Sequence, residues 1–239
     1  MDMKNQTVVV IGGSSGIGLA TARRLAEMGP RVIATGRDAT KLQNALAGLG
    51  ERIIAEAFDG GDRNALDAFF GRVGRFDHLV LALSGGEGGG EFAKLDLKTL
   101  RRGFEAKFWP QMEAAQASLQ ALRAGGSITF LTAISARMAS PGTAGLGAIN
   151  GAIESMIGAL ARELKPTRVN AVSPGVVDTP WWDQFPAEVR DGIFRQQAET
   201  LPAGRVGHAH DIAHAVQFLV ENSFMTGAII ECDGGLRLL

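Results

Sequence analysis

Short apolar runs alternate with helical patterns along almost the whole chain, and this alternation constrains the fold more than any other feature. The apolar runs are rich in β-branched residues and occupy residues 7–11, 31–35, 52–57, 78–83, 127–132, 168–172 and 228–231. Helical patterns occupy residues 16–28, 39–49, 63–73, 97–122, 144–164 and 210–220. Continuous apolar strands are typical of a parallel sheet buried on both faces. The sequence therefore predicts one α/β domain over residues 1–239 with a doubly wound, seven-stranded parallel sheet.

The composition and charge of the chain indicate which kinds of molecule it binds. The 239 residues are 46% hydrophobic, which is enough for one large core. The formal net charge is -1 and no run of Lys or Arg exceeds a pair, so we expect neither nucleic acid nor a membrane surface as a partner. The polar start, the short apolar runs and the sole cysteine, Cys232, predict a cytoplasmic protein without a signal peptide, a membrane span or an internal disulfide. A small-molecule substrate or ligand is the expected partner.

A glycine-rich turn, Gly-Gly-Ser-Ser-Gly-Ile-Gly at residues 12–18, joins the first strand to the first helix. Backbone N–H groups and the positive helix end then face one point, which suits a pyrophosphate. Glycine spacing alone would also fit a merely structural turn. The strand before, the helix after and a second strand about twenty residues further on favour dinucleotide binding.

The spacing G-x-x-x-G-x-G, together with later motifs, resembles the short-chain dehydrogenase/reductase family. These motifs are Asp-His-Leu-Val at 77–80, Arg-Val-Asn-Ala-Val-Ser-Pro-Gly at 168–175, Thr-Gly at 226–227 and Cys-Asp-Gly-Gly at 232–235. The resemblance spans nearly the whole chain and implies a Rossmann-type fold, oxidoreductase activity, and a homodimer or homotetramer formed through the long helices and the C-terminal strand. It also implies a set of cofactor-binding residues: Gly12, Ser14, Gly16, Ile17, Gly18, Asp59, Ser84, Pro174, Gly175, Val177 and Thr179.

The end of the second strand predicts which dinucleotide binds. An acidic residue that would hydrogen-bond a ribose 2′-OH is missing, since Thr35 and Gly36 occupy that turn and Arg37 follows. A guanidinium can bind a 2′-phosphate through paired N–H donors. The sequence therefore favours NADP(H) over NAD(H). Asp38 is the nearest acid, and its place before Ala39 predicts a helix N-cap.

The resembled family performs its chemistry with Tyr and Lys four residues apart, a Ser before them and an Asn on the preceding long helix. Those positions fall on Leu146, Asn150, Ala133 and Lys107, and the chain contains no tyrosine. A leucine has no proton to give to a substrate carbonyl. Losing a positioned general acid costs roughly 10²–10⁴ in rate, so the family's ordinary mechanism is not expected here.

The Asn and Lys of the family are exchanged in this chain. If Lys107 and Asn150 face each other, an ammonium would reach the same place from the opposite helix. The alternative is a lysine whose ammonium reaches solvent from an ordinary helix. Ser135 lies two residues after Ala133, and in an extended strand end it would point to the same side and donate a hydrogen bond. Lys107, Ser135 and Asn150 are therefore the candidate catalytic residues.

Three functions stay open at this stage. The chain could be an NADPH-dependent oxidoreductase that uses Lys107, Ser135 or a water as proton source. It could be a catalytically silent sensor or scaffold that binds NADP(H). It could also be a non-redox lyase or isomerase in which Lys107 is the electrophilic group.

Two further segments interrupt the alternation. Residues 84–91 contain five glycines after the fourth strand, and are either a flexible connection or a loop that lets the backbone approach a ligand. Residues 180–204 contain four aromatic residues and are either a lid or a surface buried by a neighbouring subunit: Trp181, Trp182, Phe185 and Phe194. His208 and His210 are expected at the solvated start of a helix. No Cys/His cluster has the spacing of a metal site, so no metal is predicted.

Overall fold

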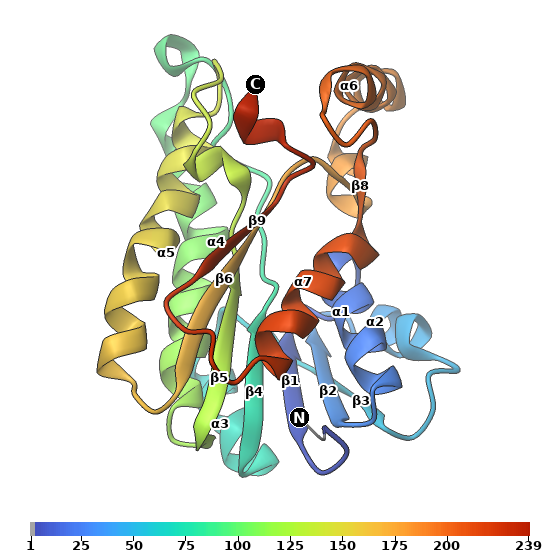
Figure 1. Cartoon of the computed structure of the whole chain (residues 1–239), viewed down its shortest axis with the longest axis vertical. Helices are drawn as coiled ribbons and strands as arrows, with labels where there is room; N and C mark the ends of the chain where they lie inside the picture. Colours follow the sequence, from blue (N-terminus) through green and yellow to red (C-terminus); the bar gives the residue numbers. More distant parts are fainter. Residues whose placement is uncertain (1–2) are drawn as a thin grey trace.

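A computed structural model describes residues 3–239 and shows a seven-stranded parallel sheet with helices on both faces (Figure 1). The strands lie in the order β3-β2-β1-β4-β5-β6-β9. Their bounds are β1 Thr7–Ile11, β2 Arg31–Gly36, β3 Ile53–Ala57, β4 Phe76–Leu81, β5 Leu122–Leu131, β6 Arg168–Pro174 and β9 Ile229–Cys232. The predicted fold class and the predicted number of strands in the sheet are confirmed.

Helices cover the two faces in two groups, which Figure 1 shows on either side of the sheet. One group is α1 Gly16–Glu27, α2 Ala39–Leu46 and α7 Ala209–Glu221, and the other is α3 Arg63–Val73, α4 Leu97–Ser118 and α5 Ala144–Glu163. Beyond the carboxyl ends of the strands stands α6, Ala187–Thr200, with the short pair β7 Val177–Asp178 and β8 Gly207–His208. The short 3₁₀ turns η2 Ile134–Ala136 and η3 Pro180–Gln184 lie at the same edge.

The continuous apolar strands follow from burial on both sides. Along β1, Val9 and Ile11 pack into the core under α3, α4 and α5, whereas Val8 and Val10 pack into the core under α1, α2 and α7. Because successive side chains of a strand point to opposite faces, both sets must be apolar. Most side chains on the sheet's faces are therefore apolar, and buried polar residues of the strands such as His78 and Ser127 bond to each other.

Some element bounds differ from the expected ones. β4 begins at Phe76 and ends at Leu81, two residues earlier than predicted at each end, and β5 begins at Leu122, where the preceding helix was expected to end. The segment between α4 and the paired part of β5 is rich in alanine and glycine, so periodicity alone could not place the boundary. α6 was not predicted, because its residues are mostly polar and none of its side chains is buried.

The sheet has its switch point between β1 and β4. From β1 the chain runs outward through β2 and β3, and then returns to form β4 on the other side of β1. Loops leaving the carboxyl ends of β1 and β4 therefore separate in opposite directions, which is where open α/β sheets bind ligands. The residues after these two strands, Gly12 and Ala82, lie directly against each other.

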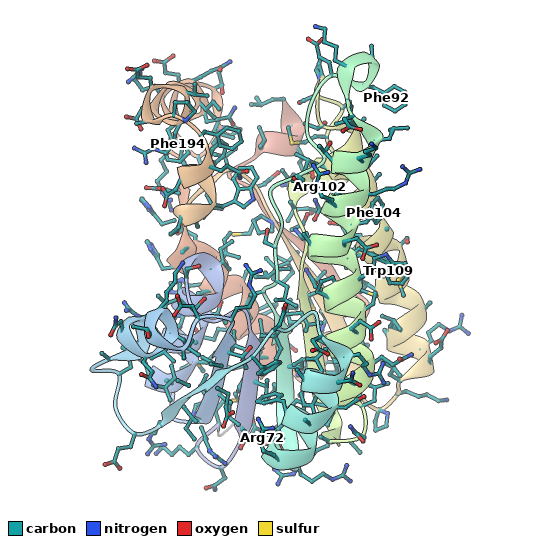
Figure 2. The ribbon with its side chains drawn as sticks, turned by 180° about the vertical axis from the view of Figure 1, so that it is seen from behind. Arg72, Phe92, Arg102, Phe104, Trp109 and Phe194 are labelled. Atoms are coloured by element: carbon teal, nitrogen blue, oxygen red, sulfur yellow. The ribbon has the colours of Figure 1, made fainter. Side chains whose placement is uncertain are left out.

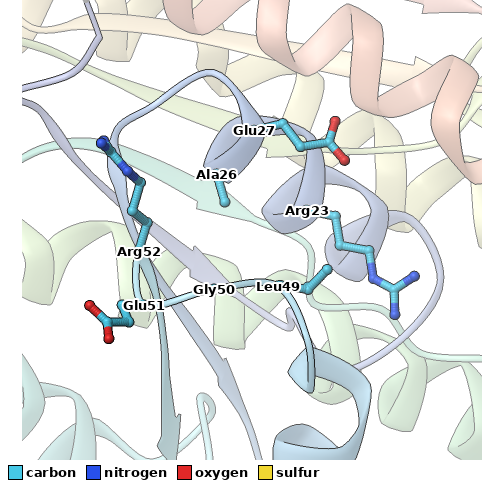
Figure 3. Close-up of a pocket in the computed structure, with 7 residues that line it drawn as sticks. All are labelled: Arg23, Ala26, Glu27, Leu49, Gly50, Glu51 and Arg52. Carbon is cyan, nitrogen blue, oxygen red and sulfur yellow. The ribbon is translucent and has the colours of Figure 1, made fainter.

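A surface pocket of about 370 Å³ lies at the opposite, amino edge of the sheet. Figure 3 shows its lining, which comes from the last turns of α1 and the segment before β3. Its charged residues are balanced in sign: Arg23 and Arg52 against Glu27 and Glu51. None of the predicted site residues lines it.

The outer surface of α4 carries aromatic side chains. Figure 2 shows Phe104 and Trp109 directed away from the sheet; Trp109 is 50% exposed and Phe104 is partly buried. α5, beside it, is long and apolar enough to cross a membrane by length and composition alone. Its Ile153 and Ile157 are fully buried in the core, which identifies α5 as a core helix of this fold. Assembly through the long helices stays a prediction.

His78 lies buried in β4 near the amino edge. Its Nδ1 is 2.8 Å from Ser127 Oγ and its Nε2 is 2.9 Å from Gln6 Oε1. Burial and, less strongly, the charge of Arg168 lower the pKa of His78 to about 4, against the opposing effect of Asp77. The neutral ring is therefore the form that the folded chain accommodates.

This burial predicts a loss of stability in mild acid. The unfolded chain takes up a proton at His78 near its ordinary pKa of 6.5, whereas the folded chain does so only near 4, so stability is full above 6.5 and falls as the pH drops toward 4. Between pH 7 and pH 5 the loss should be about 2 kcal/mol. Urea unfolding of wild type and His78→Gln at both pH values measures it, and an equal loss in the two proteins would contradict the assignment.

Candidate functional site

The amino end of α1 is the least capped of the first four helices. α2, α3 and α4 each begin behind an aspartate whose carboxylate accepts backbone N–H bonds: Asp38 from Lys41, Asp62 from Asn64 and Ala65, and Asp96 from Lys98. Ser15, at the same place before α1, makes no side-chain cap bond, and the first turn of α1 has no acidic residue. The first N–H groups of α1 and its positive dipole end are thus left for an anion.

Glycines shape the turn that precedes α1. Gly12 has φ +90° and Gly16 has φ +52°, a left-handed region that disfavours other residues. A Cβ on Gly12 would lie 2.8 Å from the carbonyl oxygen of Ala82, and one on Gly18 would overlap the carbonyl oxygen of Gly12. A Cβ on Gly16 would point at Thr179, 3.5 Å from its Cβ. The turn thus approaches both β4 and the segment after β6, as a pyrophosphate seat requires.

Arg37 follows β2 beside this turn. Gly36 packs against Ser14, and a Cβ there would lie 2.9 Å from the Cβ of Ser14. Arg37 itself is exposed, and within residues 3–239 no hydrogen bond or ion pair engages its guanidinium. Asp38 Oδ1 accepts from the backbone N–H of Lys41 at 2.9 Å, so the predicted N-cap role of Asp38 is confirmed.

The remaining predicted cofactor residues gather along the same carboxyl edge. Asp59 Oδ1 accepts from Gly61 N at 3.0 Å. Pro174 ends β6, and Gly175 packs so closely on Asp233 that a Cβ would lie 2.7 Å from its backbone. Val177 is buried in β7, while Thr179 lies at the start of η3 and Ser84 is exposed after β4.

Lys107 is buried under the same edge, so the alternative of an ammonium reaching solvent is wrong. The residue is 8% exposed, and its Nζ donates to the carbonyl oxygen of Thr132 at 3.0 Å. Burial lowers the pKa of Lys107 to about 8, while attraction to Glu154 opposes the shift. Pro110, on the following turn of α4, has no N–H to give to the carbonyl of Ala106, which loosens the helix beside Lys107.

Asn150 and Ser135 form a hydrogen-bonded pair. Asn150 Nδ2 donates to Ser135 Oγ at 3.0 Å and to the carbonyl oxygen of Leu146 at 2.9 Å. The expectation of an extended strand end is wrong, because β5 stops at Leu131 and Ser135 lies in the 3₁₀ turn η2. Lys107 and Asn150 nevertheless contact the same short segment, at Thr132 and Ser135 respectively.

A buried carboxylate that the sequence analysis did not identify lies one turn after Asn150. Glu154 Oε1 accepts from Thr132 Oγ1 and from Ser173 Oγ, each at 2.8 Å, and Oε2 accepts from Arg137 Nε at 3.0 Å. A signal for it exists in the sequence. Asn150 and Glu154 fall at helical spacing in the stripe that also contains Ile149, Ile153 and Ile157, so both are polar residues on a buried face.

The glycine-rich loop at 84–91 packs between helices. A Cβ on Gly85 would lie 2.7 Å from the Cβ of Ala106 on α4, and one on Gly145 of α5 would overlap the carbonyl oxygen of Gly88. Leu146 Cδ1 lies 3.4 Å from where a Cβ on Gly89 would be. The glycines thus allow close packing of the loop on α4 and α5, which does not fit a flexible connection, while the approach of this backbone to a ligand stays a prediction.

The aromatic segment after β6 contacts this loop. Trp181 Nε1 donates to the carbonyl oxygen of Gly85 at 3.0 Å. Trp182 stacks edge-on against Trp181 and Phe194, with ring centroids 4.9 and 5.3 Å apart. The segment therefore closes over the glycine-rich loop within one chain. His208 and His210 are exposed at the start of α7, as predicted.

The tight loop packing predicts opposite effects of two alanine substitutions on α5. Gly145→Ala forces a methyl group against Gly88 and should lower the free energy of unfolding by about 1–3 kcal/mol. Gly158→Ala meets no atom within 4 Å and should raise it by up to about 1 kcal/mol. Denaturant unfolding of both variants measures these changes. Equal effects of the two would show that the loop does not press on α5.

Comparisons with known proteins point to one family. A family model described as enoyl-(acyl carrier protein) reductase matches residues 11–237. An uncharacterized oxidoreductase of Methylorubrum extorquens is 32% identical, with 98% of this chain and 99% of that protein covered. A small-chain dehydrogenase solved in complex with NADPH is 33% identical, with TM-score 0.83 and 98% and 100% of the two chains covered. A short-chain oxidoreductase of Pseudomonas aeruginosa, described as containing an atypical catalytic center, is 27% identical, with TM-score 0.88 and 99% and 98% covered.

Proposed function

Because the chain belongs to the short-chain dehydrogenase/reductase family, we propose that it is an NADP(H)-dependent oxidoreductase whose active site departs from the family pattern. The observation that carries the proposal is the uncapped amino end of α1, which faces Thr179 and lies beside the exposed Arg37. A dinucleotide diphosphate fits that place because it is an anion and the surrounding glycines admit a backbone approach.

NADP(H) differs from NAD(H) by a phosphate at the 2′ position of the adenosine ribose. The residues near that position therefore decide which of the two binds. At the end of β2, Thr35 is buried and Gly36 packs on Ser14, so no carboxylate faces the ribose from these positions. The Arg37 guanidinium is exposed and has no competing acid bound to it within the described residues. That a relative 33% identical to this chain was solved in complex with NADPH supports the choice of the phosphorylated cofactor.

Arg37→Ala should weaken NADPH binding about 10- to 100-fold and leave NADH binding unchanged, because one charge-assisted pair to a phosphate is worth about 1.5–3 kcal/mol. Arg31→Ala is the matched control, since Arg31 is exposed at the other end of the same strand. Titrating NADPH and NADH into each of the two variants, with tryptophan fluorescence as the readout, measures these affinities. An unchanged NADPH affinity in Arg37→Ala would contradict the assigned role.

The chain must supply the proton when NADPH supplies the hydride. Leu146 cannot do so, and its side chain packs against the glycine-rich loop. Ser135 Oγ accepts a hydrogen bond from Asn150, which leaves the serine's own O–H to donate to a substrate oxygen, and solvent water returns the proton that the serine gives up. Lys107 places a positive charge at Thr132, three residues earlier in the chain, where it stabilises negative charge that develops on that oxygen.

Turnover of NADPH with an activated ketone or enone should therefore require Ser135 and a charged Lys107. Ser135→Ala should lower kcat about 10²-fold with NADPH affinity unchanged, and Ser140→Ala, nearby and exposed, should have no effect. Because Lys107 is charged below its pKa of about 8, kcat should fall as the pH rises through 8. Stopped-flow absorbance at 340 nm measures both effects. If kcat of Lys107→Met still fell as the pH rose through 8, this role of the ammonium would be contradicted.

The two other functions left open by the sequence gain no support. The relatives are described as oxidoreductases, dehydrogenases and reductases, and none is described as a sensor, a lyase or an isomerase.

A further inference from the structure

We propose that Glu154 is a positioning residue that orients Lys107 and Ser135 by holding together two segments at the carboxyl edge of the sheet, residues 132–137 and the end of β6. Its part in turnover rests on the proposed function. Its effect on Lys107 does not, because that effect can be measured in the protein alone.

The carboxylate of Glu154 joins segments that are far apart in the sequence. Thr132 follows β5, Ser173 lies in β6 directly before Pro174, and Arg137 follows η2. Each of the three donates to Glu154 over 2.8–3.0 Å. Thr132 also accepts from Lys107 through its carbonyl, and η2 contains Ser135. One side chain on α5 therefore holds the supports of both candidate catalytic groups.

Because Glu154 is buried, its carboxylate depends on hydrogen-bond donors that are held in place. The residue is 9% exposed, and Ile153 and Ile157 next to it on α5 are fully buried. Burying a carboxylate is costly unless its oxygens receive hydrogen bonds, and here both oxygens are bonded. Moving either strand end would remove a donor from a buried charge, so the arrangement resists displacement.

The negative charge of Glu154 also affects the pKa of Lys107. From α5, Glu154 attracts the ammonium and raises the pKa of Lys107 against the opposing effect of burial. Arg137, at the end of η2, pairs with Glu154 at 3.0 Å and also with Glu231 of β9 at 3.0 Å. Arg137 partly neutralises the carboxylate that Lys107 faces. Removing the charge of Glu154 should therefore lower the pKa of Lys107, and removing the charge of Arg137 should raise it.

The experiment is an NMR titration of the intact protein, labelled with ¹³C at lysine Cε, without cofactor. Lys107→Met identifies the Lys107 signal by its loss. Glu154→Gln keeps an acceptor oxygen for Thr132 and Ser173 but removes the charge, and should lower the Lys107 pKa by an amount on the order of one unit. Arg137→Gln should raise it. Glu163→Gln, an exposed acid on the same helix, is the matched control and should leave it unchanged.

Shifts of opposite sign support the proposal, because a merely structural role would disturb Lys107 in the same direction in both variants. Unchanged titration in a folded Glu154→Gln, or shifts of the same sign, would overturn it. If Glu154→Gln does not fold, Arg137→Gln decides, since Arg137 is 40% exposed at its side chain and its removal leaves Glu154 bonded to Thr132 and Ser173. An upward shift then supports the proposal, and no shift or a downward one overturns it.

Binding of NADPH is measured separately on the same samples. If the wild-type protein did not bind NADPH, the proposed function would be contradicted. The result of the Lys107 titration would still hold. Conversely, an unmoved Lys107 signal would defeat the role of Glu154 without affecting the assignment of the cofactor.

Discussion

Burial of the sheet on both faces is the constraint on which the other features depend. The side chains of β1 alternate between two apolar cores, so burying a polar group on either face is costly. Polar chemistry is therefore displaced to the strand ends. At the carboxyl edge the loops after β1 and β4 diverge, and the uncapped start of α1, Thr179 and Arg37 come together although they lie far apart in the sequence.

The other half of this edge depends on a few buried polar groups. Lys107, Asn150 and Glu154 come from the facing helices α4 and α5 and contact the segment from Thr132 to Arg137. Each contact compensates a group that is costly to bury alone. A chain that had lost its function without compensation would be expected to fill these positions with apolar residues. Here an ammonium and a carboxylate occupy two of these positions, and the amide of Asn150 bonds Ser135.

Much of this organisation could be predicted from the sequence. The strand and helix alternation predicts the sheet, and the turn at residues 12–18 predicts the glycine-shaped turn before α1, because both signals are local in the chain. Lys107 was singled out only as a departure from a family pattern, and its burial could not be read from periodicity. Glu154 was missed because its partners, Thr132 and Ser173, are brought to it by strand order, which only the fold supplies.

The packing of the glycine-rich loop has a consequence for the residue at position 146. Gly88 and Gly89 lie against Gly145 and Leu146, and Leu146 Cδ1 is 3.4 Å from where a Cβ on Gly89 would be. The residue at position 146 is therefore fitted to the loop as well as to the helix. A change from leucine to the tyrosine of the family pattern would alter the packing of this loop together with the chemistry of the site.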